Sequence, residues 1–115
     1  MTILKRKSDG IELTPRLKVA NSFWSRARGL IGTSRLDPDE GLFFPHCNSI
    51  HMWFMSMVID VVFLDQSGTV TSLHAGIKPW KLLPVSDLRA RDALELPDGS
   101  IERLGLRLGD TLCID

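Results

Sequence analysis

The segment from Val58 to Leu64 is the densest apolar run in the chain, and its β-branched residues predict a strand. The turn residues DQSG follow at 65–68, and Thr69–Ala75 then alternates between apolar and polar side chains. This order predicts an antiparallel hairpin with a tight turn. Because both faces of the first strand are apolar, we expect it to be covered on both sides.

Shorter apolar runs elsewhere predict further strands. They lie at Arg16–Ala20, from Leu42 in LFF, at Ile50–Phe54, at Ala93–Leu96 and in the final LGDTLCI. One short helix is predicted from Asn21 or Ser22 to Gly29, because the apolar residues between them recur at helical spacing. Ser100 is expected to cap a helical turn that ends at Gly105.

Strands therefore dominate and helices are short, which predicts a mostly β (α+β) fold. We expect either a small, partly closed β-barrel or a rolled antiparallel sheet, with one short covering helix. The 115 residues fit a single domain, 1–115. Residues 1–14 are expected to form a looser N-terminal end, because Ser8–Pro15 is rich in turn residues.

Composition narrows the classes of function. Basic and acidic residues number 14 each, so the formal net charge is zero, which argues against a nucleic-acid or anionic-membrane partner. The longest apolar run is too short to span a membrane, and no export signal is visible. The two cysteines, Cys47 and Cys113, cannot build a disulfide framework, so we expect a cytoplasmic location, with one disulfide between them as the alternative.

Asp60 carries the sharpest chemical question, because it lies between Ile59 and Val61 in a strand that we expect to be buried. A carboxylate without partners there would cost several kcal/mol. In a structural interpretation it accepts hydrogen bonds from Arg26 or Arg28, or from backbone amides. In a functional interpretation it forms the floor of a pocket and acts as a base or ligand anchor.

The sequence HCNSIH places a thiol and an imidazole, Cys47 and His51, close together. They suggest a nucleophile and its base, with Asp60 orienting the imidazole. In an unbroken strand His51 and Asp60 would point to opposite faces, which counts against such a triad. No CxxC or HxxxH pair is present, so we expect no bound metal, and no cofactor is indicated.

Two further residues have alternative interpretations. Trp80 lies in a predicted loop between Lys78 and Lys81, where it either stacks on a ligand or plugs one end of the barrel. Glu95 alternates with Leu94 and Leu96, so we expect its side chain to be exposed to solvent.

The segments RARGLIG, GLFFPHCNSIHMWFMSMVIDVVFLDQSGTV, KPW and ALELPDGSIERLGLRLGDTL resemble the domain of unknown function 192 family in order and spacing, over about Arg16 to Asp115. The resemblance implies a small, mostly β domain and no established activity. Family members often carry a basic residue after the Met of this segment and Pro before IDV. This chain has Ser56 and Val58 there, so we assign no role to a basic group at that place.

Three functional hypotheses follow. The first is a binding module for a small molecule or a protein partner, with a pocket near Cys47–His51, Asp60 and Trp80, and with Arg28 as a further ligand-binding candidate. The second is a small hydrolase or lyase in which His51 and Asp60 act as acid and base beside Cys47. The third is a purely structural partner subunit. The sequence leaves open which of them holds, whether the protein is an enzyme, and its oligomeric state.

Overall fold

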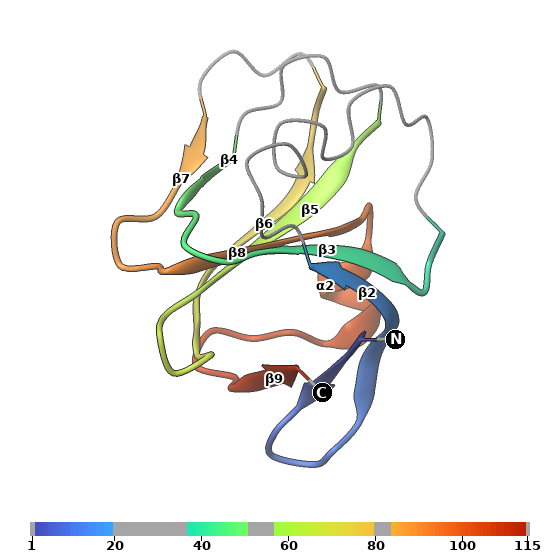
Figure 1. Cartoon of the computed structure of the whole chain (residues 1–115). Helices are drawn as coiled ribbons and strands as arrows, with labels where there is room; N and C mark the ends of the chain where they lie inside the picture. Colours follow the sequence, from blue (N-terminus) through green and yellow to red (C-terminus); the bar gives the residue numbers. More distant parts are fainter. Residues whose placement is uncertain (1, 20–36, 51–56, 80–83, 115) are drawn as a thin grey trace.

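The computed structural model of the chain describes residues 2–19, 37–50, 57–79 and 84–114, and most of them lie in strands (Figure 1). The elements are β1 (Thr2–Arg6), β2 (Glu12–Val19), β3 (Glu40–Phe44), β4 (Ser49–Ile50), β5 (Ile59–Leu64), β6 (Val70–Ile77), β7 (Val85–Ser86), β8 (Asp92–Pro97), α2 (Ser100–Leu104) and β9 (Leu112–Ile114). Seven strands form one sheet in the order β6–β5–β8–β3–β2–β1–β9, and β4 pairs with β7 separately.

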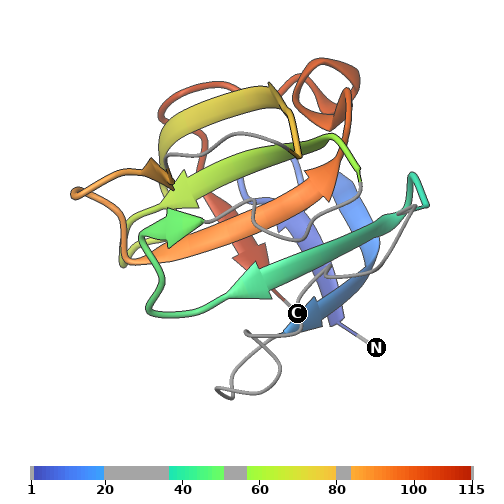
Figure 2. The ribbon, with the colours of Figure 1, turned by 90° about the horizontal axis from the view of Figure 1, so that it is seen from above.

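The large sheet is mixed and bent. Its paired strands are antiparallel except β2 and β3, which run parallel and are joined by the long segment 20–39. Strands β1, β2 and β9 cross beneath β5, β6 and β8 (Figure 2). The two ends of the sheet meet at an isolated bridge between Thr69 and Thr111. The described strands therefore form a rolled sheet that is not closed into a barrel.

The predicted mostly β fold class is confirmed for the described residues. The expected purely antiparallel pairing is wrong for β2 and β3, and the barrel form is not supported. The expected loose N-terminal end is also wrong, because β1 pairs with both β2 and β9 and its Leu4 is completely buried. The helix predicted to end at Gly29 lies outside the described residues, as does most of the strand predicted at Ile50–Phe54.

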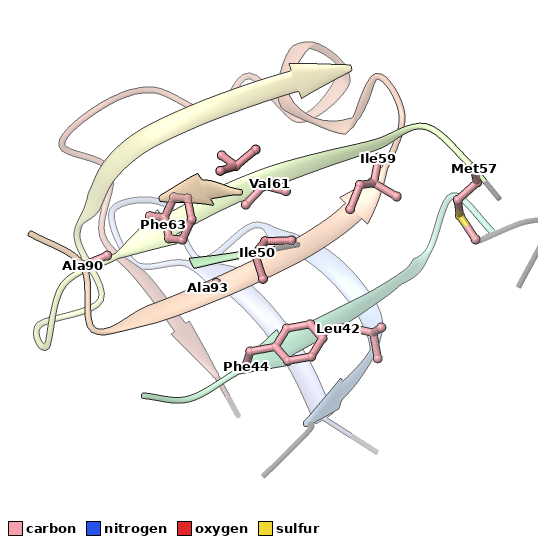
Figure 3. Close-up of a cluster of buried hydrophobic side chains, with 10 residues drawn as sticks. Leu42, Phe44, Ile50, Met57, Ile59, Val61, Phe63, Ala90 and Ala93 are labelled. Atoms are coloured by element: carbon pink, nitrogen blue, oxygen red, sulfur yellow. The ribbon is translucent and has the colours of Figure 1, made fainter. Parts of the chain in front are cut away.

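Strand β5 separates two layers of buried side chains. The outer cluster lies on the side covered by β4 and β7 and is shown in Figure 3; it consists of Leu42, Phe44, Ile50, Met57, Ile59, Val61, Phe63, Val85, Ala90 and Ala93. The inner core lies within the bend of the sheet and consists of Leu4, Leu13, Leu17, Val62, Leu64, Val70, Leu94, Leu96, Leu106 and Leu112. Alternate residues of β5 enter alternate layers, as the two-sided apolar pattern predicts.

The predicted hairpin of β5 and β6 is confirmed, with its turn at residues 65–68. The side chain of Asp65 accepts hydrogen bonds from the backbone N–H groups of Ser67 and Thr69 and so fixes the turn. The predicted helical turn is also confirmed and ends at Gly105, whose φ of 64° suits glycine. Its N-cap, however, is Gly99, and the hydroxyl of Ser100 donates to the carbonyl of Pro97 instead.

Asp87 attaches the chain after β7 to the edge strand β6. Its carboxylate is 7% exposed and accepts hydrogen bonds from the hydroxyls of Thr71 and Ser72, both at 2.7 Å, and from Nε of Arg89 at 3.1 Å. Burial by itself raises the pKa of this carboxyl, but the donors outweigh burial and hold the pKa of Asp87 well below its usual range. The charged form of Asp87 therefore stabilises the fold.

Replacement of Asp87 should make the protein less stable and less sensitive to acid. A carboxyl whose pKa is lowered by folding contributes stability above its unfolded pKa of about 4, and this contribution is lost as the pH falls below that value. Asp87→Asn should lower the free energy of unfolding at neutral pH by about 2–4 kcal/mol and flatten the acid loss below about pH 4. Urea unfolding across pH measures both effects. Asp98→Asn, at an exposed position, is the matched control, and an unchanged acid slope in Asp87→Asn would contradict the assignment.

Candidate functional site

Of the residues that the sequence grouped into one pocket, the structure describes Cys47 and Asp60, and these lie on two sides of the sheet. Cys47 packs against the outer cluster. Asp60 bonds to the first turn of α2, whose Ile101 packs against the inner core. The structure therefore does not bring Cys47 and Asp60 together. His51, Trp80 and Arg28 lie outside the described residues.

Asp60 is completely buried and is satisfied by backbone amides. Its Oδ1 accepts a hydrogen bond from the N–H of Gly76 at 2.9 Å, and its Oδ2 accepts one from the N–H of Ile101 at 2.8 Å. These bonds join the start of β5 to the irregular end of β6 and to the start of α2. The backbone-amide alternative thus holds for the described residues, while a bond to Arg26 or Arg28 stays a prediction.

Glu95 is the acidic residue whose environment differs most from expectation. We expected an exposed side chain, but Glu95 is only 5% exposed, so that prediction is wrong. It lies in β8, directly opposite Leu42 of β3 and Val61 of β5, and both neighbours belong to the outer cluster. Its Oε2 is buried, and no described residue donates a hydrogen bond to it.

Burial raises the pKa of Glu95 to about 7. Buried carboxyls elsewhere in the molecule have donors: Asp60 has two backbone amides, and Asp92 has the guanidinium of Arg91 and the N–H of His46. Glu95 therefore changes between its neutral and charged forms close to physiological pH, in apolar surroundings. A carboxyl of this kind can accept a hydrogen bond, exchange a proton or hold a cationic group.

A sequence signal for the burial of Glu95 exists, although alternation within β8 conceals it. Strand β5 is apolar on both faces, which indicates a cover above and below the sheet. Strand β8 lies between β5 and β3 in the sheet, so it is covered as β5 is, and its polar residues are buried as well. Finding Glu95 by this reasoning requires the knowledge that β8 pairs with β5, and local sequence does not provide it.

A cavity of about 210 Å³ lies on the opposite side of the sheet, between the turn after β5 and strand β9. Side chains of the inner core, including Leu64 and Leu112, form much of its wall. Arg91 also lines this cavity. Its guanidinium is already paired with Asp92, because Nε and Nη2 donate to the carboxylate oxygens over 3.0–3.2 Å. Because this cavity has no unmatched charge among its lining residues, we place the candidate site at Glu95.

Metal binding has no support in the described part of the chain. No group of three or more His, Cys, Asp or Glu side chains there is arranged to hold an ion. The expected absence of a bound metal or cofactor stays a prediction. Among the same residues, no helix is long and apolar enough to cross a bilayer.

Comparison with known proteins identifies the family. The model of the family DUF192, described as an uncharacterized ACR, matches residues 4–114. This chain belongs to the DUF192 family. A UPF0127 protein of Thermococcus sibiricus is 35% identical to it over 114 residues, which are 96% of this chain and 73% of that protein. The match begins within β1, so the N-terminal hairpin is part of the DUF192 domain.

Two crystal structures share the fold of this DUF192 domain. A Sinorhizobium meliloti protein has a TM-score of 0.82 at 24% identity, covering 97% of this chain and 90% of that one. A Novosphingobium aromaticivorans protein of unknown function also has a TM-score of 0.82, at 22% identity, covering 97% of this chain and 82% of that one. At these identities the likeness shows the fold alone.

The geometry at Asp60 predicts a large loss of stability when its charge is removed. In Asp60→Asn the amide offers a single oxygen, so either Gly76 or Ile101 keeps a buried N–H that faces another donor. We expect the free energy of unfolding to fall by about 2–4 kcal/mol, measured by urea unfolding at neutral pH. Asp98→Asn should change it by less than about 0.5 kcal/mol, because that position is exposed. A neutral or stabilising Asp60→Asn substitution would refute the structural role.

Removing the carboxyl of Glu95 should raise the free energy of unfolding at neutral to alkaline pH, whereas removing the charge of Asp60 should lower it. Below about pH 4.5 its carboxyl is neutral in both the folded and the unfolded chain and adds no penalty. As the pH rises towards 7 the unfolded chain ionises first, so stability falls, by about 3 kcal/mol in total. Glu95→Leu should therefore raise the free energy of unfolding at about pH 8 by roughly 1–3 kcal/mol.

The measurement is urea unfolding of wild type, Glu95→Leu and Glu95→Gln between acid and mildly alkaline pH. Both variants should lack the fall in stability that ends near pH 7. Glu102→Gln, at an exposed position of α2, is the control and should keep that fall. If Glu95→Leu is less stable than wild type above pH 7, the carboxyl has a stabilising partner and the assignment fails.

Proposed function

We propose that this small β domain binds a small, mainly apolar molecule that carries an amine or another hydrogen-bond donor, and that Glu95 holds this group. The observation that supports the proposal is the buried Oε2 of Glu95, which has no donor among the described residues. A buried acid of this kind lowers stability, and such a cost is typical of binding and catalytic sites. A ligand that brings its own donor would match the carboxyl.

The neighbours of Glu95 suit a ligand with a large apolar part. Leu42 and Val61 flank the carboxyl, and Met57 of the same outer cluster has an adaptable side chain. Cys47 packs against this cluster too, so the Cys47–His51 part of the predicted pocket stays in the proposal while Asp60 leaves it. His51, Trp80 and Arg28 remain proposed ligand contacts.

A second candidate function is acid–base catalysis, as in the hydrolase or lyase alternative. The pKa of Glu95, raised by burial to about 7, favours it, because proton transfer is efficient when the pKa lies near the working pH. In this form of the hypothesis Glu95 takes the place of Asp60, whose two oxygens are occupied by backbone amides.

We propose a reducing, cytoplasmic location, which agrees with the free thiols of Cys47 and Cys113.

The test is a titration of the ¹⁵N-labelled domain with hexylamine and with 1-hexanol at about pH 8, where Glu95 is mostly charged. Hexylamine should shift the backbone amide signals of Leu42, Val61 and Glu95, and it should bind more tightly than hexanol. Glu95→Gln should weaken hexylamine at least about tenfold, a loss of about 1.4 kcal/mol. Glu102→Gln should leave its affinity within about twofold.

Two results would overturn the binding proposal. One is the absence of shifts at these three residues up to about 10 mM hexylamine, which excludes even weak binding. The other is equal hexylamine affinity in wild type and Glu95→Gln, because the amine would then be held elsewhere. Either result would favour the purely structural alternative for this face of the sheet.

A further inference from the structure

The cavity beside the turn after β5 is a second place where the described structure has room for a ligand. Its volume is about 210 Å³. Leu4, Leu64 and Leu112 of its wall are at most 4% exposed, and two more wall residues, Phe43 and Ile114, pack against the same inner core. An apolar cavity of about 150 Å³ is large enough for benzene. This one therefore has room for a ring with a short substituent.

Backbone hydrogen bonds fix the rim of the cavity. The N–H of Leu112 donates to the carbonyl of Gly68, and the N–H of Arg91 donates to the carbonyl of Leu64, both at 2.8 Å. Gly68 has a φ of 82°, and a Cβ atom there would lie only 2.4 Å from the carbonyl oxygen of Leu112. The turn and β9 are thus held together at one side of the cavity. Its walls are preformed, as those of ligand sites usually are.

The polar groups of the cavity select the kind of hydrogen bond that a ligand can make. The buried carboxylate of Asp92 already accepts one bond from the N–H of His46 and three from the guanidinium of Arg91. A carboxylate has about four acceptor positions, so Asp92 has none left for an amine. Nη1 of Arg91, in contrast, donates to no described residue. Gln66 and Ser67 are exposed and can both donate and accept, so they do not discriminate.

The charges near the cavity disfavour an anionic ligand. The pKa of Arg91 is raised by its hydrogen bonds to Asp92 and, to a smaller extent, by the charge of Asp65. Two carboxylates therefore lie near one guanidinium, and an added negative charge would be repelled. An uncharged ligand with an acceptor avoids both this repulsion and the lack of a free acceptor for an amine.

We propose that this cavity is a second ligand site, which binds a small uncharged molecule with a ring-sized apolar body and one hydrogen-bond acceptor, such as a ketone. The apolar body lies among Leu4, Leu64 and Leu112, and Nη1 of Arg91 donates to the acceptor. The site lies on the opposite side of the sheet from Glu95. It does not rest on the proposed function, and the two can fail separately.

The first experiment titrates the ¹⁵N-labelled domain with acetophenone, benzylamine and phenylacetate at about pH 7.5, where the three share an aromatic ring but are neutral, cationic and anionic. Acetophenone should shift the backbone amide signals of Leu64, Gly68 and Leu112. It should bind there at least about tenfold more tightly than either charged molecule. The absence of these shifts up to about 10 mM acetophenone, or tighter binding of a charged ring at these residues, would overturn the proposal.

The second experiment repeats the titration with variants of the wall and of the donor. Ile114→Phe puts a larger side chain into the cavity and should weaken acetophenone at least about tenfold. Arg91→Met keeps a long side chain but removes the donor and frees Asp92 to accept, so the preference for acetophenone over benzylamine should fall at least about tenfold. Arg107→Met, at an exposed position outside the cavity, is the control and should keep both affinities within about twofold.

Wild-type affinity for acetophenone in folded Ile114→Phe would place the ligand elsewhere and overturn the site. An unchanged preference in folded Arg91→Met would overturn the role of the guanidinium. If Arg91→Met does not fold without the partner of Asp92, the comparison of the three ring molecules on the wild-type protein decides the selectivity.

Discussion

The burial of β5 on both faces is the constraint on which the rest of the structure depends. All six of its residues are buried, and their apolar side chains pack alternately into the outer cluster and the inner core. Burying a large apolar side chain contributes about 1.5–3 kcal/mol, so a strand covered twice is a main source of stability. The same burial removes water from each polar group on β5 and on its neighbour β8. Those groups need partners within the protein.

The buried acids of the domain meet this need in different ways. Asp60 uses backbone amides from β6 and α2, Asp87 uses hydroxyls and a guanidinium, and Asp92 uses Arg91 and a backbone amide. In each case the donors come from separate parts of the chain, so the carboxylate also joins those parts together. Glu95 stands apart, because its Oε2 has no donor among the described residues and its neighbours in the paired strands, Leu42 and Val61, are aliphatic. This contrast is the reason for placing the proposed site there.

The sequence predicted the parts of the fold that short-range signals determine. The hairpin of β5 and β6 follows from a β-branched run, turn residues and an alternating return strand, and the turn of α2 ends at Gly105 as predicted. The parallel pairing of β2 with β3 was missed, because it depends on a connection that places distant segments side by side. The N-terminal hairpin was not predicted, because turn residues around Gly10 indicate a loose end as readily as the turn between β1 and β2.

The site was less predictable than the fold, and the reason is again strand pairing. The apolar residues around Asp60 predict its burial from its own strand alone, but Asp60 lies on the opposite side of β5 from Cys47. Glu95 lies in β8, and only the pairing of β8 with β3 and β5 puts it between Leu42 and Val61. Residues that come together only through the pairing of distant strands have no short-range sequence pattern that would predict their contact.

The pairing of β9 with β1 has a consequence for how this sheet is assembled. Leu4 lies opposite Ile114, so one edge of the sheet joins the first strand to the last. On a ribosome, β1 leaves the exit tunnel long before β9 has been made, and until then one edge of β1 has no partner strand. An unpaired edge of this kind can recruit other chains, and contacts between such distant residues form slowly. The nascent domain therefore has a period of exposure that ends only when its final strand is released.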